Sequence, residues 1–273
     1  MAAIKTFING IETTHLSCED RGFHYGDGLF ETLRIIEGEP KDWSLHFARL
    51  RKGCERLHLA VPDEQHLHEE ALAICQEQEL AVLKIILTRG KSGRGYRSEP
   101  GQGTRVVQLH AFPNYPVDYW VRGINIRICD TPVSINPKLA GIKHLNRLEN
   151  VLARNEWHDE NIVEGIMTDG QGRWVEGTMT NLFLVKDKVL YTPELSQAGV
   201  EGVMRQRVIR RAIDFGITTR IQGINHDFAF DADELFVTNS LIGIWPVKNL
   251  EGQSFPVGTI TTQLAKSLLS SPL

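Results

Sequence analysis

The segment LAGIKHLNRLENVLARNEW, residues 139–157, is the stretch around which the rest of the chain can be interpreted. Leu145, Leu148 and Leu152 recur at the spacing of an α-helix, and Val151 lies beside them. Arginine and glutamate residues fall between these positions and would supply the polar faces. The segment is therefore predicted to form an amphipathic helix that follows a glycine-containing turn.

Lys143 lies where the predicted turn gives way to the predicted helix, behind the apolar Ala140 and Ile142. Partial desolvation disfavours the charged ammonium, so we expect the pKa of Lys143 to fall. A neutral amine can then act as a nucleophile or a base at neutral pH. An ordinary surface lysine at the start of a helix would look the same in the sequence, and the rest of the chain decides between the two interpretations.

The overall composition is that of a globular protein without a strong charge preference. The chain has 273 residues, enough for one large domain or two smaller ones around a substantial core. Hydrophobic residues make up 41% and charged residues 23% of the chain, which is ordinary for a globular domain. The net charge of -4 argues against a protein built mainly to bind nucleic acid.

The chain shows no pattern typical of secretion or membrane insertion. The N-terminal MAAIKTFING lacks the hydrophobic core of a signal peptide, and no apolar run reaches membrane-spanning length. Cys18, Cys54, Cys75 and Cys129 are widely spaced without a CxxC pair, so neither a zinc site nor a disulfide framework is indicated. We expect a cytoplasmic protein with reduced thiols, no bound metal and no membrane partner.

Strand-like and helix-like patterns are mixed along the chain, which predicts an α+β (mixed α/β) fold in two domains. The proline-containing PNYPVDYW, residues 113–120, is the candidate linker. We expect a smaller α/β domain at 1–113, a linker at 114–120, and a larger domain at 121–273 that carries Lys143. Helices are predicted at 44–59 with Ser44 as N-cap, at 63–79 and at 260–269. Residues 199–216 are predicted to form a turn that leads into a helix, with Gly216 as its C-terminal stop. Strands are predicted at 4–8, 29–36, 80–87, 104–111, 123–130, 164–168, 173–177, 181–186, 189–192 and 234–238.

Three further features suit the chemistry of Lys143. Glu176 lies at a predicted strand end, where a carboxylate can hold a protonated ring nitrogen. The free amides of Val203 and Met204, at the start of a predicted helix, favour a phosphate, and Arg49 offers a second phosphate contact. An amine nucleophile, an acid for a pyridinium and a phosphate cradle are the parts that a pyridoxal phosphate site needs. Alone, Glu176 and Arg49 could each be ordinary surface residues.

A basic, glycine-rich loop follows the predicted strand at 80–87. It reads TRGKSGRGYR, residues 88–97, and contains Arg89, Arg94 and Arg97. Guanidinium groups bind carboxylates and phosphates through paired hydrogen bonds, so the loop suits an anionic ligand. A solvated surface loop would have the same composition.

Taken together and in order, these pieces resemble the fold-type IV pyridoxal phosphate enzymes. That family includes D-amino acid and branched-chain aminotransferases and 4-amino-4-deoxychorismate lyase. The resemblance covers nearly the whole chain. It rests on DRGFHYGDGLFETLR, HFARL, TRGKSGRGY, the block around Lys143, EGTMTNLF, GVMR and DELFVTNS. It implies the two-domain fold of the D-amino acid aminotransferases, pyridoxal 5'-phosphate as cofactor, and a homodimer.

The resemblance also implies roles for individual residues of this chain. Lys143 corresponds to the lysine that forms the Schiff base, and Glu176 to the partner of the pyridine nitrogen. The implied phosphate ligands are Arg49, the backbone of Val203 and Met204, and Ser240, with Asn239 beside them. The implied substrate contacts are Arg94, Tyr96 and Tyr25, and Thr32 is an implied catalytic residue.

Within this family the chain is most similar to the lyase branch. AGIKHLNRLENVLAR is the strongest reason, and Thr32 in FETLR and the SGRGY loop agree with it. This similarity implies conversion of 4-amino-4-deoxychorismate, a small-molecule substrate, into 4-aminobenzoate and pyruvate, in folate biosynthesis. An aminotransferase on the same scaffold is the alternative, because Arg94 falls where the D-amino acid enzymes keep a carboxylate-binding arginine. A non-catalytic protein that binds pyridoxal phosphate is a weaker alternative.

Overall fold

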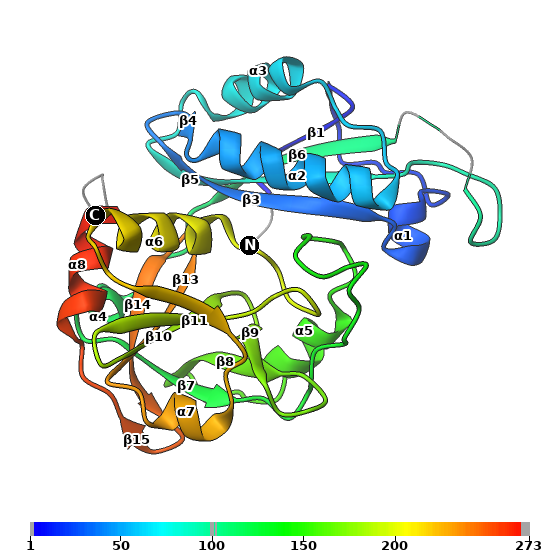
Figure 1. The fold of residues 1–273 in the computed structure, drawn as a ribbon. Helices are drawn as coiled ribbons and strands as arrows, with labels where there is room; N and C mark the ends of the chain where they lie inside the picture. Colours follow the sequence, from blue (N-terminus) through cyan, green and yellow to red (C-terminus); the bar gives the residue numbers. More distant parts are fainter. Residues whose placement is uncertain (1–2, 99–100, 102, 269–273) are drawn as a thin grey trace. The chain divides into compact units, whose positions relative to one another are not determined.

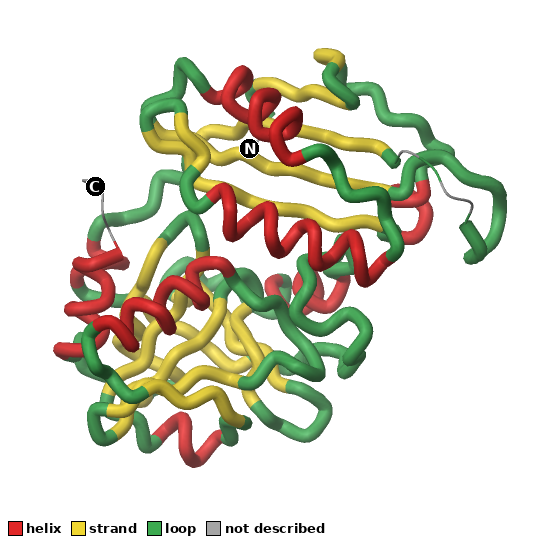
Figure 2. The backbone as a smooth tube through the Cα atoms, turned by 45° about the horizontal axis from the view of Figure 1, so that its top comes forward, coloured by secondary structure: helices red, strands yellow, loops and turns green. Residues whose placement is uncertain are grey.

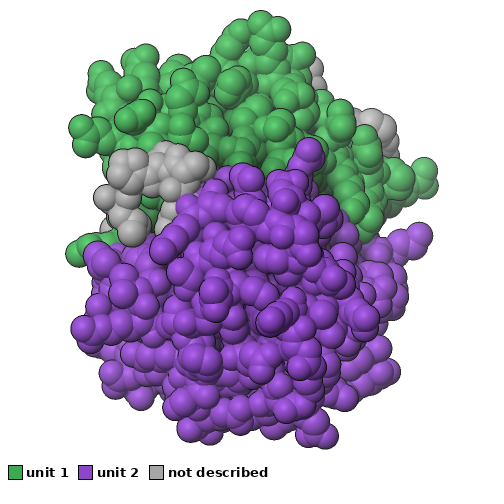
Figure 3. Space-filling model, turned by 60° about the vertical axis from the view of Figure 1, so that its left-hand side comes forward, with its two compact units in different colours: residues 1–114, 142–146 green, residues 115–141, 147–273 purple. Residues whose placement is uncertain are grey.

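The computed structural model describes residues 3–98, 101 and 103–268. The chain divides into two compact units, which are coloured separately in Figure 3. Unit 1 contains Met1–Asn114 and Ile142–Asn146, and unit 2 contains Tyr115–Gly141 and Arg147–Leu273. Both units combine helices and strands, so the predicted mixed α/β class is confirmed.

The described part of unit 1 is built on one antiparallel sheet. Its strands are β1 (Lys5–Ile8), β2 (Ile11–Glu12), β3 (Gly28–Ile36), β4 (Glu39–Pro40), β5 (Leu80–Thr88) and β6 (Thr104–Ala111). They pair in the order β2-β1-β6-β5-β3-β4. Its helices are α1 (Arg21–Tyr25), α2 (Trp43–Leu57) and α3 (Glu64–Cys75). Helices α2 and α3 lie on the same face of the sheet (Figures 1 and 2).

Strand β3 shows why the two faces of this sheet differ. Leu29, Glu31, Leu33 and Ile35 are buried, whereas Phe30, Thr32 and Arg34 are partly exposed. Because successive side chains of a strand point to opposite faces, the buried set lies under α2. Phe30 and Thr32 therefore belong to the opposite face of the sheet.

Unit 2 contains a larger mixed sheet. Its strands are β7 (Ile124–Ile128), β8 (Ile162–Thr168), β9 (Trp174–Gly177), β10 (Asn181–Lys186), β11 (Val189–Pro193), β12 (Thr219–Gln222), β13 (Glu234–Asn239), β14 (Gly243–Leu250) and β15 (Gln253–Ser254). In the described part they pair in the order β12-β11-β10-β13-β14-β7-β8-β9, and β15 pairs with β14. Its helices are α4 (Asp118–Val121), α5 (Leu148–Arg154), α6 (Val203–Asp214), α7 (His226–Phe230) and α8 (Thr259–Leu268).

Apolar side chains pack on both faces of the central strands of unit 2. On one face Phe183 and Phe236 stack with ring centroids 5.0 Å apart and pack with α6 and α8. On the other face Trp245 is fully buried and contacts the rings of Tyr119 and Trp120 of α4. The strands are buried on both faces, which explains their nearly continuous hydrophobic sequences.

The helix expected around Lys143 differs from the prediction. Helix α5 begins only at Leu148, and Leu148, Val151 and Leu152 are exposed rather than buried. Residues 142–146 instead run beside β3, so their backbone bonds go to another strand and not to a helix. The spacing of Leu148, Val151 and Leu152 was correct for a helix, but the prediction that the helix begins near Lys143 was wrong.

The proposed linker and domain boundary can be compared with the units. The division falls between Asn114 and Tyr115, and the residues that follow form α4 and pack in unit 2. Trp120 donates its ring N–H to the carbonyl oxygen of Ile242, so this stretch is an ordered part of unit 2. The five residues Ile142–Asn146, expected in the larger domain, belong to unit 1.

Two helix ends also differ from the sequence-based expectation. Helix α2 begins at Trp43 with Asp42 at the N-cap position, so Ser44 is not the N-cap. Helix α3 ends at Cys75 and not at residue 79, because the carbonyls of Gln78 and Glu79 accept from the hairpin turn after β3. Helix α8 agrees with the expected 260–269 up to residue 268, and residue 269 lies outside the described residues. Within the described residues, no helix is both long enough and apolar enough to cross a membrane.

Candidate active site

Lys143 is held against β3 by its own backbone. The amide of Phe30 donates to the carbonyl oxygen of Lys143 at 2.9 Å, and the amide of Leu145 donates to that of Gly28 at 3.0 Å. The Nζ atom of Lys143 lies 4.3 Å from the centroid of the Phe30 ring. Thr32 is the next residue of β3 on the same face as Phe30. Unit 1 therefore places Lys143 over an aromatic ring that an adjacent strand supplies.

A second cation lies on this strand pair. Lys84 pairs with Thr32 across β3 and β5, and its Nζ atom lies 5.6 Å from the Phe30 centroid. Lys84 and Lys143 thus approach the same ring, so this face of the sheet is positively charged. Lys84 was not singled out from the sequence, because it lies within an apolar run that predicts only a buried strand.

Arg49 lies on the other face of the sheet, in a buried ion pair. Its Nε atom donates to Oε1 of Glu31 at 2.8 Å and its Nη2 atom to Oε2 at 2.5 Å. Oε2 also accepts from Nδ1 of His46 at 2.6 Å. Burial raises the pKa of Glu31, but the charge and hydrogen bonds of Arg49, together with His46, outweigh burial and lower it to about 2.

Glu176 occupies a buried position on β9 in unit 2. Its Oε2 atom accepts from the amide of Val200 at 2.8 Å and from the side-chain amide of Asn181 at 3.4 Å. Asn181 also donates to the carbonyl oxygen of Val200 at 2.9 Å. The carboxylate is therefore fixed between β10 and the turn that leads to α6.

The N-terminus of α6 lies beside the same asparagine. Gly202 is the N-cap, and no side chain of the described residues caps the helix there. A Cβ atom on Gly202 would lie 1.9 Å from Oδ1 of Asn181, so any larger residue would collide. Val203 and Met204 begin the helix, where the first backbone amides have no partner within the helix and the dipole favours an anion.

Arg205, one residue further, adds a buried positive charge that sequence reasoning missed. It is 6% exposed and donates to the hydroxyl of Thr192 and the carbonyl oxygen of Pro193. Burial lowers the pKa of Arg205, while the carboxylates of Glu201 and Glu176 act in the opposite direction. Arg205 is thus a cation whose field reaches Glu176 within unit 2.

The loop after Glu176, residues 178–180, is held by Glu164. This fully buried carboxylate accepts from the amides of Gly165, Thr178 and Met179 and from two threonine hydroxyls. Burial raises the pKa of Glu164, and the hydrogen bonds oppose the rise without cancelling it. Asn239 joins the loop by donating to the carbonyl oxygen of Met179 at 3.3 Å.

Ser240 follows Asn239 directly at the end of β13. The side chain of Asn239 also accepts from the amides of Leu241 and Ile242, which forms a turn around Ser240. Within unit 2, hydrogen bonds join Glu176 and Asn181 to Val200, which precedes α6, and Asn239 of the β13 turn to Met179.

The predicted substrate loop of unit 1 is anchored by Arg21. Arg21 donates to the carbonyl oxygens of Gly95 at 2.7 Å and Tyr96 at 3.1 Å, and its guanidinium lies 4.7 Å from the Tyr25 ring centroid. The rings of Tyr25 and Tyr96 are 5.6 Å apart in an edge arrangement. Arg94 is exposed on the same loop. The structure thus brings Tyr25 and Tyr96 together and leaves Arg94 at the surface.

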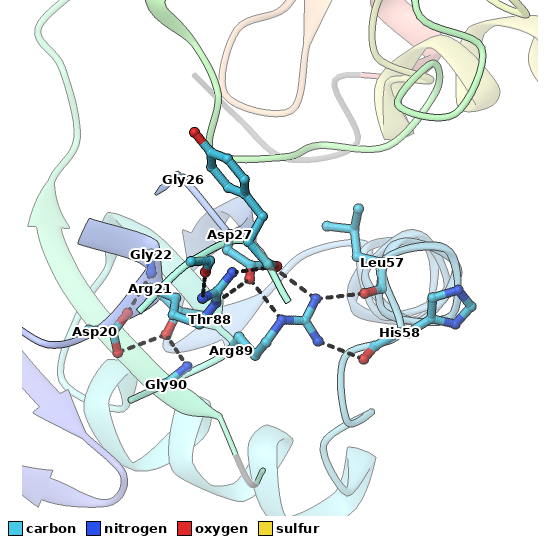
Figure 4. Close-up of polar contacts among 12 residues, drawn as sticks. Asp20, Arg21, Gly22, Gly26, Asp27, Leu57, His58, Thr88, Arg89 and Gly90 are labelled. Carbon is cyan, nitrogen blue, oxygen red and sulfur yellow. Dashed lines mark hydrogen bonds and ion pairs between the residues drawn. The ribbon is translucent and has the colours of Figure 1, made fainter. Parts of the chain in front are cut away.

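Asp27 joins this loop to the rest of unit 1 (Figure 4). Asp27 accepts from Arg21 at 3.0 Å and from two nitrogens of Arg89 at 2.8 and 3.0 Å. Arg89 also donates to the carbonyl oxygens of Leu57 and His58 at the end of α2. Burial raises the pKa of Asp27, but hydrogen bonds and charges from both arginines outweigh burial and hold the pKa below its usual value.

Asp20 completes the contacts drawn in Figure 4. It caps α1 by accepting from the amide of Gly22, and it accepts from the hydroxyls of Thr88 and Thr104. The sequence pointed to DRGFHYGD only as part of a family motif and did not single out Arg21 or Asp27. The available signal was the dense alternation of acids and arginine between glycines.

A hollow of about 440 Å³ lies elsewhere in unit 1. Its described lining comes from the loop after α2, the end of β5 and the start of β6. None of the eleven residues predicted for the site is part of that lining. The hollow is therefore not the predicted active site.

Known proteins are similar to this chain along most of its length. An aminodeoxychorismate lyase of Vibrio harveyi is 34% identical over 267 residues, 96% of this chain and 98% of that protein. The crystal structure of 4-amino-4-deoxychorismate lyase from Pseudomonas aeruginosa shares 42% identity and superposes with a TM-score of 0.93, covering 97% and 98% of the two chains. A D-alanine aminotransferase of Bacillus licheniformis is 27% identical over 283 residues, 98% of each chain.

Residues 28–250 match the sequence profile of the amino-transferase class IV family. The chain belongs to this family. The expected fold-type IV architecture is confirmed by the match and by the similarity to the Pseudomonas structure. The match begins at the start of β3 and extends to the end of β14, so it contains both Lys143 and Glu176.

The pKa of Glu31 generates a prediction about acid stability. Its folded value of about 2 lies below the ordinary value of 4.5. The carboxylate therefore stabilises the fold fully above the ordinary value, and this contribution is lost as the pH falls through 4.5 towards 2. The loss amounts to up to about 3 kcal/mol. Urea unfolding at several pH values gives the free energy of unfolding of wild type and of Glu31→Gln. The two free energies should approach each other as the pH falls from 4.5 to about 2. A constant separation at all pH values would contradict the assignment.

Proposed function

We propose that this protein is a pyridoxal phosphate-dependent lyase that converts 4-amino-4-deoxychorismate into 4-aminobenzoate and pyruvate. The observation that carries the proposal is the ranking of its relatives. Proteins named as this lyase reach 34% and 42% identity over nearly the whole chain, whereas a candidate branched-chain-amino-acid aminotransferase reaches 30% and the D-alanine aminotransferase 27%. An aminotransferase on the same scaffold is the alternative, because the family includes both activities.

The side chains present fit pyridoxal 5'-phosphate. Lys143 offers an amine beside an aromatic ring, and Glu176 offers a buried carboxylate held by two donors. The uncapped start of α6 at Val203 and Met204 suits a phosphate group. We also assign phosphate contacts to Arg49 and to Ser240 with its neighbour Asn239. The basis for these assignments is that the positions match motifs of the family.

Each proposed residue has a step to perform. When bound, pyridoxal phosphate withdraws electrons from the carbon that carries the substrate amine. Glu176 would hold the protonated ring nitrogen of the bound cofactor, and Arg205 places a buried positive charge near Glu176 within unit 2. Lys143 removes the proton from the amine-bearing carbon and later returns a proton to the departing pyruvate. Loss of the enolpyruvyl group leaves an aromatic ring, which makes the reaction strongly downhill.

Two substrate-facing roles complete the proposal. Thr32 lies on the same sheet face as Phe30 and favours elimination over transamination. Arg94 binds a substrate carboxylate, and Tyr25 and Tyr96 form the neighbouring aromatic surface. We further propose that the protein acts in the cytoplasm.

The lyase reaction is tested by product analysis. Incubation of the purified protein and its cofactor with 4-amino-4-deoxychorismate should release equal amounts of 4-aminobenzoate and pyruvate, because one elimination yields both. Lys143→Ala should lower the rate by roughly 10³-fold or more, since it removes both the covalent link and the base. Borohydride treatment should tag Lys143. Rapid transamination between D-alanine and 2-oxoglutarate, without release of pyruvate from 4-amino-4-deoxychorismate, would establish the alternative. A borohydride tag on another lysine would refute the assignment of Lys143.

The role of Arg94 is tested by kinetics. Arg94→Ala should raise KM for 4-amino-4-deoxychorismate by about tenfold with little change in kcat, because a carboxylate contact made in ground and transition states contributes to both. Arg97→Ala is the matched control, since Arg97 is exposed on the same loop and has no proposed role. An unchanged KM in Arg94→Ala would show that another group binds the carboxylate.

We also propose a homodimer that covers α5. The exposed Leu148, Val151 and Leu152 form one apolar side of this helix, and apolar residues grouped at helical spacing are typical of an interface. Sedimentation of the wild type should give twice the chain mass of 30.8 kDa. Leu148→Glu should shift the protein towards the monomer, whereas Ile213→Glu, at an exposed position of α6, should not. A wild-type monomer would exclude the dimer.

A further inference from the structure

The cluster of Glu31, His46 and Arg49 is the most deeply buried group of charges in unit 1. Glu31 is 1%, His46 2% and Arg49 7% exposed. Glu31 extends from β3 between Leu29 and Leu33, both of which pack as core residues under α2. The other two residues come from the facing side of α2, three positions apart and hence on the same side of the helix.

Stability alone does not account for these charges. Removing a carboxylate and a guanidinium from water costs several kcal/mol per ion, and an apolar pair of similar volume is often as stable or more so. The neighbouring buried positions of β3 are leucine and isoleucine, so the core face is otherwise apolar. We therefore relate the charges to function through Arg49, because it is the residue of the cluster that has a proposed ligand.

The carboxylate of Glu31 is held from two sides. Arg49 donates Nε–H to Oε1 and Nη2–H to Oε2, which is the paired geometry that fixes the plane of a guanidinium. An ionised carboxylate only accepts, so the Nδ1 atom of His46 carries the hydrogen that it donates to Oε2 at 2.6 Å. Glu31 can therefore rotate neither away from the helix nor around its own axis without breaking a hydrogen bond.

His46 adds an independent sign of specialisation. Its Nε2 atom is buried and has no hydrogen-bond partner among the described residues. A buried polar atom without a partner costs about 1–3 kcal/mol, whereas phenylalanine would avoid that cost. The hydrogen bond from Nδ1 to Glu31 is therefore the interaction that favours histidine over phenylalanine at this position.

We propose that Glu31 and His46 are positioning residues that hold the Arg49 guanidinium in the orientation that binds the phosphate group of the cofactor. The inference rests on the proposed function, in which Arg49 is a phosphate ligand. His46 fixes Glu31, and Glu31 fixes Arg49, so the guanidinium loses no rotational freedom when a phosphate binds. Two effects compete here, because Glu31 also neutralises part of the charge that attracts the phosphate. The paired hydrogen bonds indicate that orientation outweighs charge.

The test compares two ligands that differ only in the phosphate. Dissociation constants for pyridoxal 5'-phosphate and for pyridoxal are measured on the full-length apoprotein. The constant for pyridoxal divided by the constant for pyridoxal 5'-phosphate reports how much the phosphate contributes to binding. Glu31→Gln should reduce that ratio by about tenfold, since an amide NH₂ replaces one acceptor and faces a donor. His46→Phe should reduce it by roughly threefold, because only one support of Glu31 is lost. A loss of affinity that is equal for both ligands would show a merely structural role and overturn the proposal.

A matched control separates general damage from the specific effect. Glu70 on α3 accepts from Arg105 on β6 in a partly buried ion pair of the same unit. Glu70→Gln should lower the thermal midpoint of unfolding without changing the ratio of the two dissociation constants. If Glu31→Gln does not fold, His46→Phe carries the test, and an unchanged ratio in that variant refutes the proposal.

Arg49→Met separates this inference from the function on which it rests. If Arg49→Met leaves the ratio unchanged, Arg49 is not a phosphate ligand and the proposed assignment of the cofactor phosphate fails. If Arg49→Met lowers the ratio but Glu31→Gln and His46→Phe do not, only the positioning role is wrong. If Glu31→Gln raises the ratio, charge neutralisation outweighs orientation, and the proposal is overturned in the opposite direction.

Discussion

The pairing of residues 142–146 with β3 is the constraint on which the rest of the account depends. Two backbone hydrogen bonds, from Phe30 to Lys143 and from Leu145 to Gly28, hold the lysine as an extended residue beside a strand. A lysine inside a helix would present its amine according to the turn of that helix. Here the strand sets its position, and the Phe30 ring lies 4.3 Å from the amine. The chemistry proposed for Lys143 needs such a fixed amine.

Buried carboxylates organise both units in the same physical way. Glu31 and Asp27 in unit 1 are held by arginines, whereas Glu176 and Glu164 in unit 2 are held mainly by amides and hydroxyls. The first arrangement lowers the pKa of the acid strongly, and the second leaves burial as the larger effect on Glu164. Glu164 in particular holds the loop after Glu176 in one conformation, because it accepts from three backbone amides and two threonine hydroxyls.

Membership of the class IV family leaves more than one activity open. The same scaffold supports the lyases and the aminotransferases to which the chain is similar, and both reactions begin with removal of a proton from the carbon that bears the amine. We propose that the sheet face with Phe30, Thr32 and two lysines, together with the loop that carries Arg94, separates the two outcomes. Function therefore depends on a few side chains placed on a shared fold.

The sequence by itself determined the elements whose signal is local. The strands around Leu29, Leu83 and Phe183 follow from continuous or alternating hydrophobic residues. Helix α6 ends at Asp214, two residues before Gly216, whose positive φ of 69° is typical of a residue that follows a helix. The family motifs also pointed to Lys143 and Glu176 without a structure. These features depend on residues close together in the chain, so their patterns can be recognised in one dimension.

Only the tertiary structure decided which residues meet across the sequence. The leucines of α5 have helical spacing but are exposed, because residues 142–146 pair with β3 and the helix starts later. Alternation along β3 put Glu31 on the core face, yet its partners His46 and Arg49 come from a helix more than ten residues away. Likewise, Arg21 and Arg89 meet at Asp27 from distant segments. Such contacts arise when separate elements pack together. A local sequence pattern does not contain the information that selects them.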